Sequence, residues 1–316
     1  MATAPPSPAV FRRRRLVALG VLLLAIGVAA VLLLRGGDEE EPAPRTAAPE
    51  KADKPVELPR GGRRLLPDNR IVAFYGAPQA DELGDLGIGS PASAARRLER
   101  QAKPYARPGR PVLPAMELIA VVAAAHPEEG GRYNTRQDDS VIRRYLRAAR
   151  RAKALLVLDI QPGRSDFFTE ATRLEKWLRE PDVGLALDPE WRMGPNEVPG
   201  DVIGSVEARE VNAVSEWLSQ LVVRNKLPQK LFLIHQFTDD MVDDTQLRER
   251  EGLAMVLNAD GFGTQELKRV KYHAFTSSPR RFFHTGFKLF YREDTDLMKP
   301  RQVLRLRPPP DVVIYE

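Results

Sequence analysis

The chain has 316 residues, of which 43% are hydrophobic, so it is long enough for one large domain or two small ones with a substantial core. It contains no cysteine, which excludes disulfide bonds, thiolate nucleophiles and thiolate metal sites. The formal net charge is +5, but positions 1–64 hold 11 basic and 7 acidic residues and so account for +4 of it. Residues 65–316 are therefore close to neutral, which argues against a nucleic-acid partner.

The N-terminus predicts a membrane anchor. Four consecutive arginines, Arg12–Arg15, precede the uncharged run Leu16–Leu34. At about 1.5 Å per residue this run is long enough to cross a hydrocarbon core of about 30 Å. Because the more basic flank stays inside, we expect residues 1–15 in the cytoplasm and a single-pass protein of the cell membrane. A cleavable signal peptide is the alternative, with a candidate cleavage site at residues 27–30, but the apolar run continues beyond it.

Residues 35–64 predict a disordered tether. They are rich in proline, alanine and charged residues and show no apolar periodicity. Fully extended, such a segment reaches many tens of ångströms. We therefore expect an extracytoplasmic domain, residues 65–316, that reaches into the cell envelope.

Beyond the tether, eight apolar, strand-like runs alternate with amphipathic helical stretches. The runs cover residues 71–76, 111–120, 154–160, 183–191, 230–237, 253–263, 286–291 and 311–316. Helices are expected at 91–103, 139–153, 165–180, 207–226, 264–277 and 294–306, with a short one near 242–251. The helix at 165–180 begins with Ser165-Asp166, a plausible cap.

Strands that alternate with helices predict an α/β fold with a parallel sheet. Eight strands favour closure into a TIM-type (β/α)8 barrel over an open, doubly wound sheet. No Gly-x-Gly-x-x-Gly follows the first strand, which weakens a dinucleotide-binding interpretation. The pattern lacks the helix after the eighth strand, so we expect the segment before Ile71, or a partner, to cover that gap.

Polar side chains gather at the ends of the predicted strands. In a parallel barrel these ends open on one mouth, where the active sites of such barrels lie. Residues two apart in a strand point the same way. This parity brings three pairs to the mouth: Asp159 with Gln161, Asp188 with Glu190, and Asn258 with Asp260. The other polar strand ends are Tyr75, Glu117, His235, Gln236, Lys288, Tyr291 and Tyr315.

These residues also have structural explanations. Asp159, Asp188 and Asp260 each precede or adjoin a proline or glycine and fit turns. His235 fits a hydrogen-bonded core histidine. Glu117 is harder to explain, because an unpaired buried carboxylate is costly, although a structural pair with Arg or Lys is an alternative.

The cluster of acids is typical of glycoside hydrolysis, which needs one protonated and one ionised carboxyl group beside the glycosidic bond. Clustered acids raise each other's pKa, which prepares one of them as a proton donor. We expect Glu190 to be that donor, since it is the longer side chain at the outer end of its strand, beside Trp191. Asp188 and Asp159, then Asp260 and Glu117, are the candidates for base, nucleophile or stabilising carboxylate. The expected substrate contacts are Tyr75, Glu117, Gln161, Trp191, His235, Gln236, Asn258 and Tyr291, with Phe262 as a further aromatic surface.

Two resemblances follow from these motifs. Asp188 and Glu190 in LALDPEW resemble the strand-four acids of barrel glycoside hydrolases, including lysozyme-like and chitinase-like families. The chitinase-like pattern has a further Asp where Ala186 stands here, and families with a catalytic Glu ending strand seven are not matched, since Glu293 lies beyond that strand. Residues 70–275, through LDIQPGRS, LALDPEW, IHQF and DGFG, resemble a group of exported actinobacterial barrel proteins. That resemblance implies the fold and the envelope location and no reaction.

Other functions remain open at this point. A divalent metal is an alternative to a site without cofactors, with oxygen and imidazole ligands from Glu117, Asp159, Asp188, Glu190, His235 and Asp260. Only four histidines occur, and none forms a close pair. A carbohydrate-binding module without turnover is the other alternative. We expect a membrane-anchored hydrolase of a cell-envelope polysaccharide, in contact with the membrane through residues 16–34.

Overall fold

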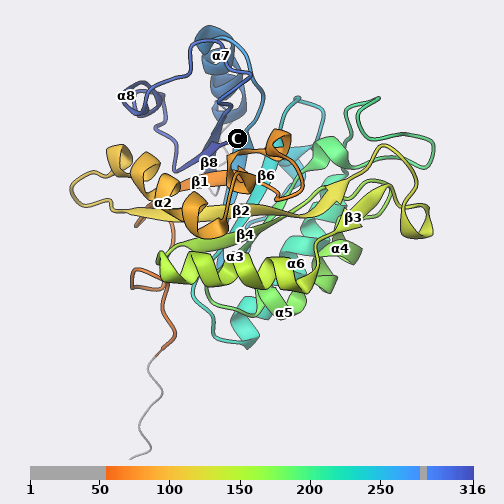
Figure 1. Cartoon of the computed structure of the whole chain (residues 1–316), viewed down its shortest axis with the longest axis horizontal. Helices are drawn as coiled ribbons and strands as arrows, with labels where there is room; N and C mark the ends of the chain where they lie inside the picture. Colours follow the sequence, from red (N-terminus) through yellow and green to blue (C-terminus); the bar gives the residue numbers. More distant parts are fainter. Residues whose placement is uncertain (1–54, 278–282) are drawn as a thin grey trace, which may run out of the picture. The chain divides into compact units, whose positions relative to one another are not determined.

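The computed structural model describes residues 55–277 and 283–316 (Figure 1). These residues belong to one compact unit, Lys54–Glu316. The expected cytoplasmic segment 1–15, the apolar span Leu16–Leu34 and most of the tether lie outside the described residues. Within those residues, no helix is both long enough and apolar enough to cross a membrane.

Eight parallel strands close into a barrel, as the sequence predicts. Each strand pairs with its neighbours in parallel, and the last pairs with the first, which closes the ring. The strands are β1 (Arg70–Gly76), β2 (Val112–Ala123), β4 (Leu155–Ile160), β5 (Val183–Leu187), β6 (Lys230–Gln236), β7 (Leu253–Ala259), β8 (His284–Leu289) and β9 (Val312–Tyr315).

A ninth strand, β3 (Asn134–Arg136), was not expected from the sequence. It pairs antiparallel with Val121–Ala123, the end of β2. At 12 residues β2 is longer than its neighbours, and its register with β4 shifts between Ile119 and Val121. The extra length carries β2 past the ring, where β3 supplies the backbone partners that the barrel no longer provides.

Helices cover the outside of the barrel (Figure 1). They are α2 (Pro91–Ala102), α3 (Asp139–Arg151), α4 (Phe167–Arg173), α5 (Glu175–Leu178), α6 (Ala208–Arg224), α7 (Gln265–Thr276) and α8 (Pro300–Val303). Short 3-10 turns are η1 (Asp81–Leu83), η2 (Asp85–Gly87), η3 (Lys103–Tyr105), η4 (Glu129–Gly131), η5 (Pro189–Trp191) and η6 (Asp244–Gln246). The Asp166 side chain accepts a hydrogen bond from the Thr169 N–H at 2.7 Å, so the expected cap at the start of α4 is confirmed.

Two expected helices are much shorter than the sequence suggests. The segment 294–306 contains only the four-residue α8, because Pro300 stands at its first turn and Asp296 has a positive φ of 57°. The segment 242–251 contains only η6, since the Arg248 N–H is held by the Asn212 side chain instead of a helical carbonyl. The helix expected at 165–180 divides into α4 and α5 at Leu174.

The hydrophobic core has two layers. One cluster lies between the strands and the helices and includes the apolar faces of α3 and α6. The other fills the barrel interior with side chains from alternate strand positions, among them Ile71, Leu113, Val157 and Ala254. The interior is therefore packed, and any cavity must lie at one of its ends.

The segment before β1 closes the end of the barrel where the strands begin. Leu58, Leu65 and Leu66 are buried in the interior cluster. The Gln229 side-chain oxygen accepts hydrogen bonds from the N–H groups of Leu65 at 2.8 Å and Leu66 at 3.1 Å. Residues 55–64, which composition assigns to the tether, thus include side chains that pack against the barrel.

Leu66 should be needed for stability. It is 2% exposed, so Leu66→Ala leaves a cavity at the base of the barrel and should lower the free energy of unfolding by about 2–5 kcal/mol. Val56, 48% exposed in the same segment, provides the control variant Val56→Ala. Urea unfolding of the two variants is the measurement, and equal stability would show that the segment does not seal the interior.

Candidate active site

The strand pattern directs a set of polar side chains into the barrel interior. Interior core positions include Ile119, Val157, Ala186, Leu233 and Val256. Residues an even number of positions away on the same strand point the same way. The polar side chains placed inside by this parity are Glu117, Asp159, Asp188, His235 and Asn258, all of them buried.

A chain of charged contacts crosses this interior. The Lys288 ammonium lies 3.1 Å from Asp260 Oδ2 and 2.6 Å from Glu316 Oε2. His235 lies between two acids, with Nδ1 2.9 Å from Asp260 Oδ2 and Nε2 3.0 Å from Glu117 Oε1. Asn258 Nδ2 lies 3.2 Å from His235 Nδ1. Residues of the four strands β2, β6, β7 and β8, together with the residues just after β7 and β9, thus share one network.

A second network joins it through Tyr75, the strand-end residue of β1. The Tyr75 hydroxyl donates to Asp159 Oδ2 at 3.1 Å and lies 3.5 Å from Asp188 Oδ2. Gln161 Nε2 donates to the Tyr75 hydroxyl at 2.9 Å. The Lys288 ammonium sits 3.9 Å from the centre of the Tyr75 ring, which links the two networks.

Three groups of the ionic chain are held in their charged forms. Burial alone would lower the pKa of Lys288, but Asp260 and Glu316 raise it well above its ordinary value. Burial would likewise lower the pKa of His235, but its hydrogen bonds to Asp260 and Glu117 raise it well above the ordinary range. Burial favours the protonated form of Asp260, but Lys288 and His235 outweigh it and hold the pKa well below the ordinary value.

The pKa values of three other carboxyl groups of the site are raised. Burial, followed by repulsion from Asp188, raises the pKa of Asp159 well above its ordinary value. Burial, followed by repulsion from Asp188 and Asp260, raises the pKa of Glu190 to about 8. Asp188 shows a smaller rise, caused by burial and opposed by His235 and Lys288. The site therefore contains protonated and ionised carboxyl groups at neutral pH.

A cavity of about 320 Å³ opens above these networks, at the end of the barrel where the strands finish. Polar groups on its wall come from Tyr75, Glu82, Gln161, Asp188, Glu190, Asp260, Lys288 and Glu316. Its aromatic wall consists of Trp191, Phe237, Phe262 and Phe290. Two hollows elsewhere, of about 820 and 750 Å³, are larger, but the buried acids lie at this one. A concave site with apolar walls and a few converging polar groups is the usual form of a ligand site.

The structure brings most of the expected site residues together, at two depths. Tyr75, Gln161, Asp188, Glu190, Trp191 and Asp260 line the cavity. Asp159, Glu117, His235 and Asn258 lie beneath it in the two networks. They are placed to support the cavity residues and not to touch a ligand directly, which differs from the expected substrate contacts of Glu117, His235 and Asn258.

Two expected substrate contacts lie elsewhere. Gln236 is buried but has the opposite strand parity to His235 and does not line the cavity. Tyr291 stacks on Tyr315, with ring centres 5.2 Å apart, and lines a small neighbouring hollow with Glu82 and Glu316.

Three charged residues of the site are not predicted from the sequence. Lys288 is identified there only as a polar strand end, and Glu82 and Glu316 are not singled out. The available signal was a lysine in the apolar run GFKLFY, since a buried lysine requires carboxylate partners. No protein-family model matches this chain, and no curated protein sequence matches it.

The raised pKa of Glu190 predicts a pH-dependent difference in stability. Its folded-state pKa, about 8, exceeds the ordinary 4.5, so the folded protein holds this proton more tightly than the unfolded chain. The resulting stabilisation is complete below pH 4.5 and is lost as the pH rises through about 8. Glu190→Gln cannot ionise, so its free energy of unfolding should increase relative to that of the wild type over this range.

Urea unfolding of both proteins across a pH series is the measurement. Glu266→Gln, at an exposed position on α7, is the matched control for loss of one carboxyl group. A difference between wild type and Glu190→Gln that stays constant across the series would refute the raised pKa.

Proposed function

We propose that the barrel is a glycoside-hydrolase-like enzyme that acts on a glycan of the cell envelope. The observation that carries this proposal is the position of Glu190 and Asp188 on the wall of one cavity, where burial and the neighbouring acids raise the pKa of Glu190 to about 8. The envelope location rests on the apolar run Leu16–Leu34 in the sequence.

Glu190 is the general acid in this proposal. A carboxyl group with a pKa of about 8 still holds its proton at neutral pH and can release it to a glycosidic oxygen as the carbon–oxygen bond breaks. Glu190 follows β5 within η5, beside Trp191, where it reaches the cavity without a side-chain hydrogen bond to the described residues.

Asp188 is the second carboxyl group. Its Oδ1 is buried at the floor of the cavity and accepts no hydrogen bond from the described residues, so this oxygen has no protein partner to neutralise it. Asp260 also lines the cavity, but both of its oxygens are occupied, Oδ1 by the Gly261 N–H and Oδ2 by His235 and Lys288. Asp159 lies beneath the cavity and acts through Tyr75. Asp188 is thus the base or nucleophile, and Asp159 and Asp260 support it.

The cavity walls fit a carbohydrate better than a strongly charged substrate. Trp191, Phe262 and Phe290 offer flat apolar faces, and Phe262 is 60% exposed. Gln161 and Glu82 supply hydrogen-bonding groups for hydroxyls. The carboxylates around the cavity disfavour phosphorylated ligands by repulsion.

Glu190→Gln should abolish glycan hydrolysis. Removing a general acid lowers the rate by about 10²–10⁴-fold, and the thermal midpoint should not fall. Wild-type activity should decline as the pH rises through about 8, where Glu190 loses its proton. Release of reducing ends from a panel of wall polysaccharides measures this, with Glu266→Gln as the control. Measurable glycan affinity without turnover by the wild type would favour a binding module instead.

A second candidate function, metal-dependent hydrolysis, is favoured by one group of side chains. Glu117, Asp159 and His235 each offer a ligand atom, and these atoms all lie within 4.8 Å of one another. Asp159 Oδ1, 3.9 Å from His235 Nε2, is buried and accepts no hydrogen bond from the described part of the chain. Asp260 orients the ring through Nδ1, as carboxylates do for metal-bound histidines. The acid–base function ranks first because a metal would have to replace the hydrogen bond between His235 Nε2 and Glu117 Oε1, which are 3.0 Å apart.

If a metal is required, the purified protein should retain Zn²⁺ or Mn²⁺, and EDTA should lower both its thermal midpoint and its activity. Elemental analysis after dialysis is the measurement. Glu117→Gln should lose the ion, and Glu266→Gln should retain it. Chelator-insensitive activity and stability, with no retained metal, would eliminate this candidate.

A further inference from the structure

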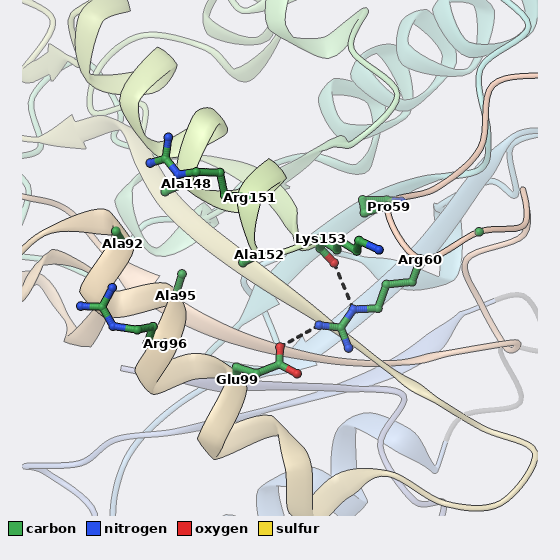
Figure 2. Close-up of a pocket in the computed structure, with 11 residues that line it drawn as sticks. Pro59, Arg60, Ala92, Ala95, Arg96, Glu99, Ala148, Arg151, Ala152 and Lys153 are labelled. Atoms are coloured by element: carbon green, nitrogen blue, oxygen red, sulfur yellow. Dashed lines mark hydrogen bonds and ion pairs between the residues drawn. The ribbon is translucent and has the colours of Figure 1, made fainter.

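A groove of about 820 Å³ lies on the outside of the barrel between α2 and α3 (Figure 2). Its floor consists of small side chains, and its rim is charged. The floor residues are Ala92 and Ala95 of α2, Ala148 of α3, and Ala152 just after it. The charged rim residues are Arg60, Arg96, Glu99, Arg151 and Lys153.

The rim is strongly basic. Arg96, Arg151 and Lys153 are exposed, and none of their side chains pairs with an acid among the described residues. Glu99 is the acid on the rim, and it is already paired with Arg60 at 2.7 Å, as Figure 2 shows. One helical turn away, the same helices present three more exposed arginines, Arg100, Arg144 and Arg147. Residues 65–316 as a whole are close to neutral, so this face concentrates positive charge.

The groove lies towards the end of the barrel opposite the cavity. Lys153 stands two residues before β4, and the Arg60 guanidinium donates to the Val112 carbonyl, at the first residue of β2, at 3.1 Å. Both strands begin at this end, whereas the cavity opens where the strands finish. Pro59, Arg60 and Gly61 form one wall of the groove, so the chain that arrives from the N-terminus passes along it.

We propose that this groove and its flanking arginines dock the barrel on a bilayer that contains anionic phospholipids. Arginines around a floor of alanines leave room for phosphate headgroups to approach several cations at once. The bilayer is favoured over a soluble polyanion by the position of the groove on the chain. The groove wall begins about 25 residues after Leu34, the end of the apolar run, a reach of at most about 85 Å. The proposal rests on the predicted anchor and is independent of the catalytic function.

Docking in this way also sets the direction of the cavity. Because the groove lies towards the opposite end of the barrel, contact with the bilayer turns the cavity away from it. A polymer in the envelope then has access to Glu190 without approaching the lipid surface.

Flotation with lipid vesicles tests the proposal on residues 55–316, which form a compact unit with their own core. We expect binding to vesicles of phosphatidylcholine mixed with phosphatidylglycerol, weakened by salt, and none to phosphatidylcholine alone. Each basic side chain near an anionic surface contributes about fivefold to partitioning, equivalent to about 1 kcal/mol. The double variant Arg96→Glu/Arg151→Glu should therefore lose about 25-fold or more.

Arg248→Glu/Arg292→Glu is the control, since it makes the same charge change at exposed positions that do not line the groove. It should bind vesicles like the wild type. Circular dichroism checks that each variant is folded, and Arg96→Gln/Arg151→Gln replaces the reversed pair if that pair fails to fold. Equal losses in the two double variants would overturn the proposal. Absence of vesicle binding would overturn it too, as would binding to soluble polyphosphate alone.

Discussion

The contact between Lys288, Asp260, His235 and Glu117 is the constraint on which the rest of the site depends. These residues are drawn from β8, the residue after β7, β6 and β2, so the contacts exist only when the ring is closed. Each charge is buried, and a buried charge is tolerated only with its partners in place. The ionic chain therefore ties the register of four strands to the chemistry of the mouth.

The same constraint explains the distribution of protons. Lys288 and His235 form ion pairs with Asp260 and Glu117. The nearby acids Asp159 and Glu190 form no hydrogen bond with either cation, and their pKa values are raised. These pKa values rise because further negative charge in the interior is unfavourable. Glu190, with its raised pKa, thus faces the cavity beside Asp188. Lys288 and His235 oppose the rise in the pKa of Asp188. The acid–base pair is a product of the charge balance of the whole interior.

Much of the barrel follows from the sequence because its period is regular. Eight apolar runs and the spacing between them predict the closed parallel sheet, and alternation along β4, β5 and β7 predicts which acids converge. The observed elements differ from the predicted ones where the regular apolar pattern ends. β3 depends on the excess length of β2, and the short α8 depends on Pro300 and on the backbone at Asp296, neither of which a hydrophobic period reports.

The sequence also does not predict how deep each polar side chain lies in the barrel. Alternation tells which way a side chain points but not how far down the barrel it sits, so Glu117 and His235 were expected at the ligand and lie beneath it. Gln236 follows His235 directly and therefore points to the other side. The sequence alone does not reveal the role of Lys288, because a single lysine in an apolar run can be interpreted only once its partners, Asp260 and Glu316, are known.

The segment that contains Leu58, Leu65 and Leu66 determines which end of the domain responds first to a pulling force on the N-terminal side of the chain. A tensile load on the chain before residue 55 is transmitted first to Leu58, Leu65 and Leu66, and to the backbone contact from the Gln229 N–H to the Arg63 carbonyl. These contacts carry the load before the strand ladder does, because they lie between the pulling point and β1. A force applied at residue 55 would accordingly separate this segment from the base of the barrel before it reached the cavity at the far end.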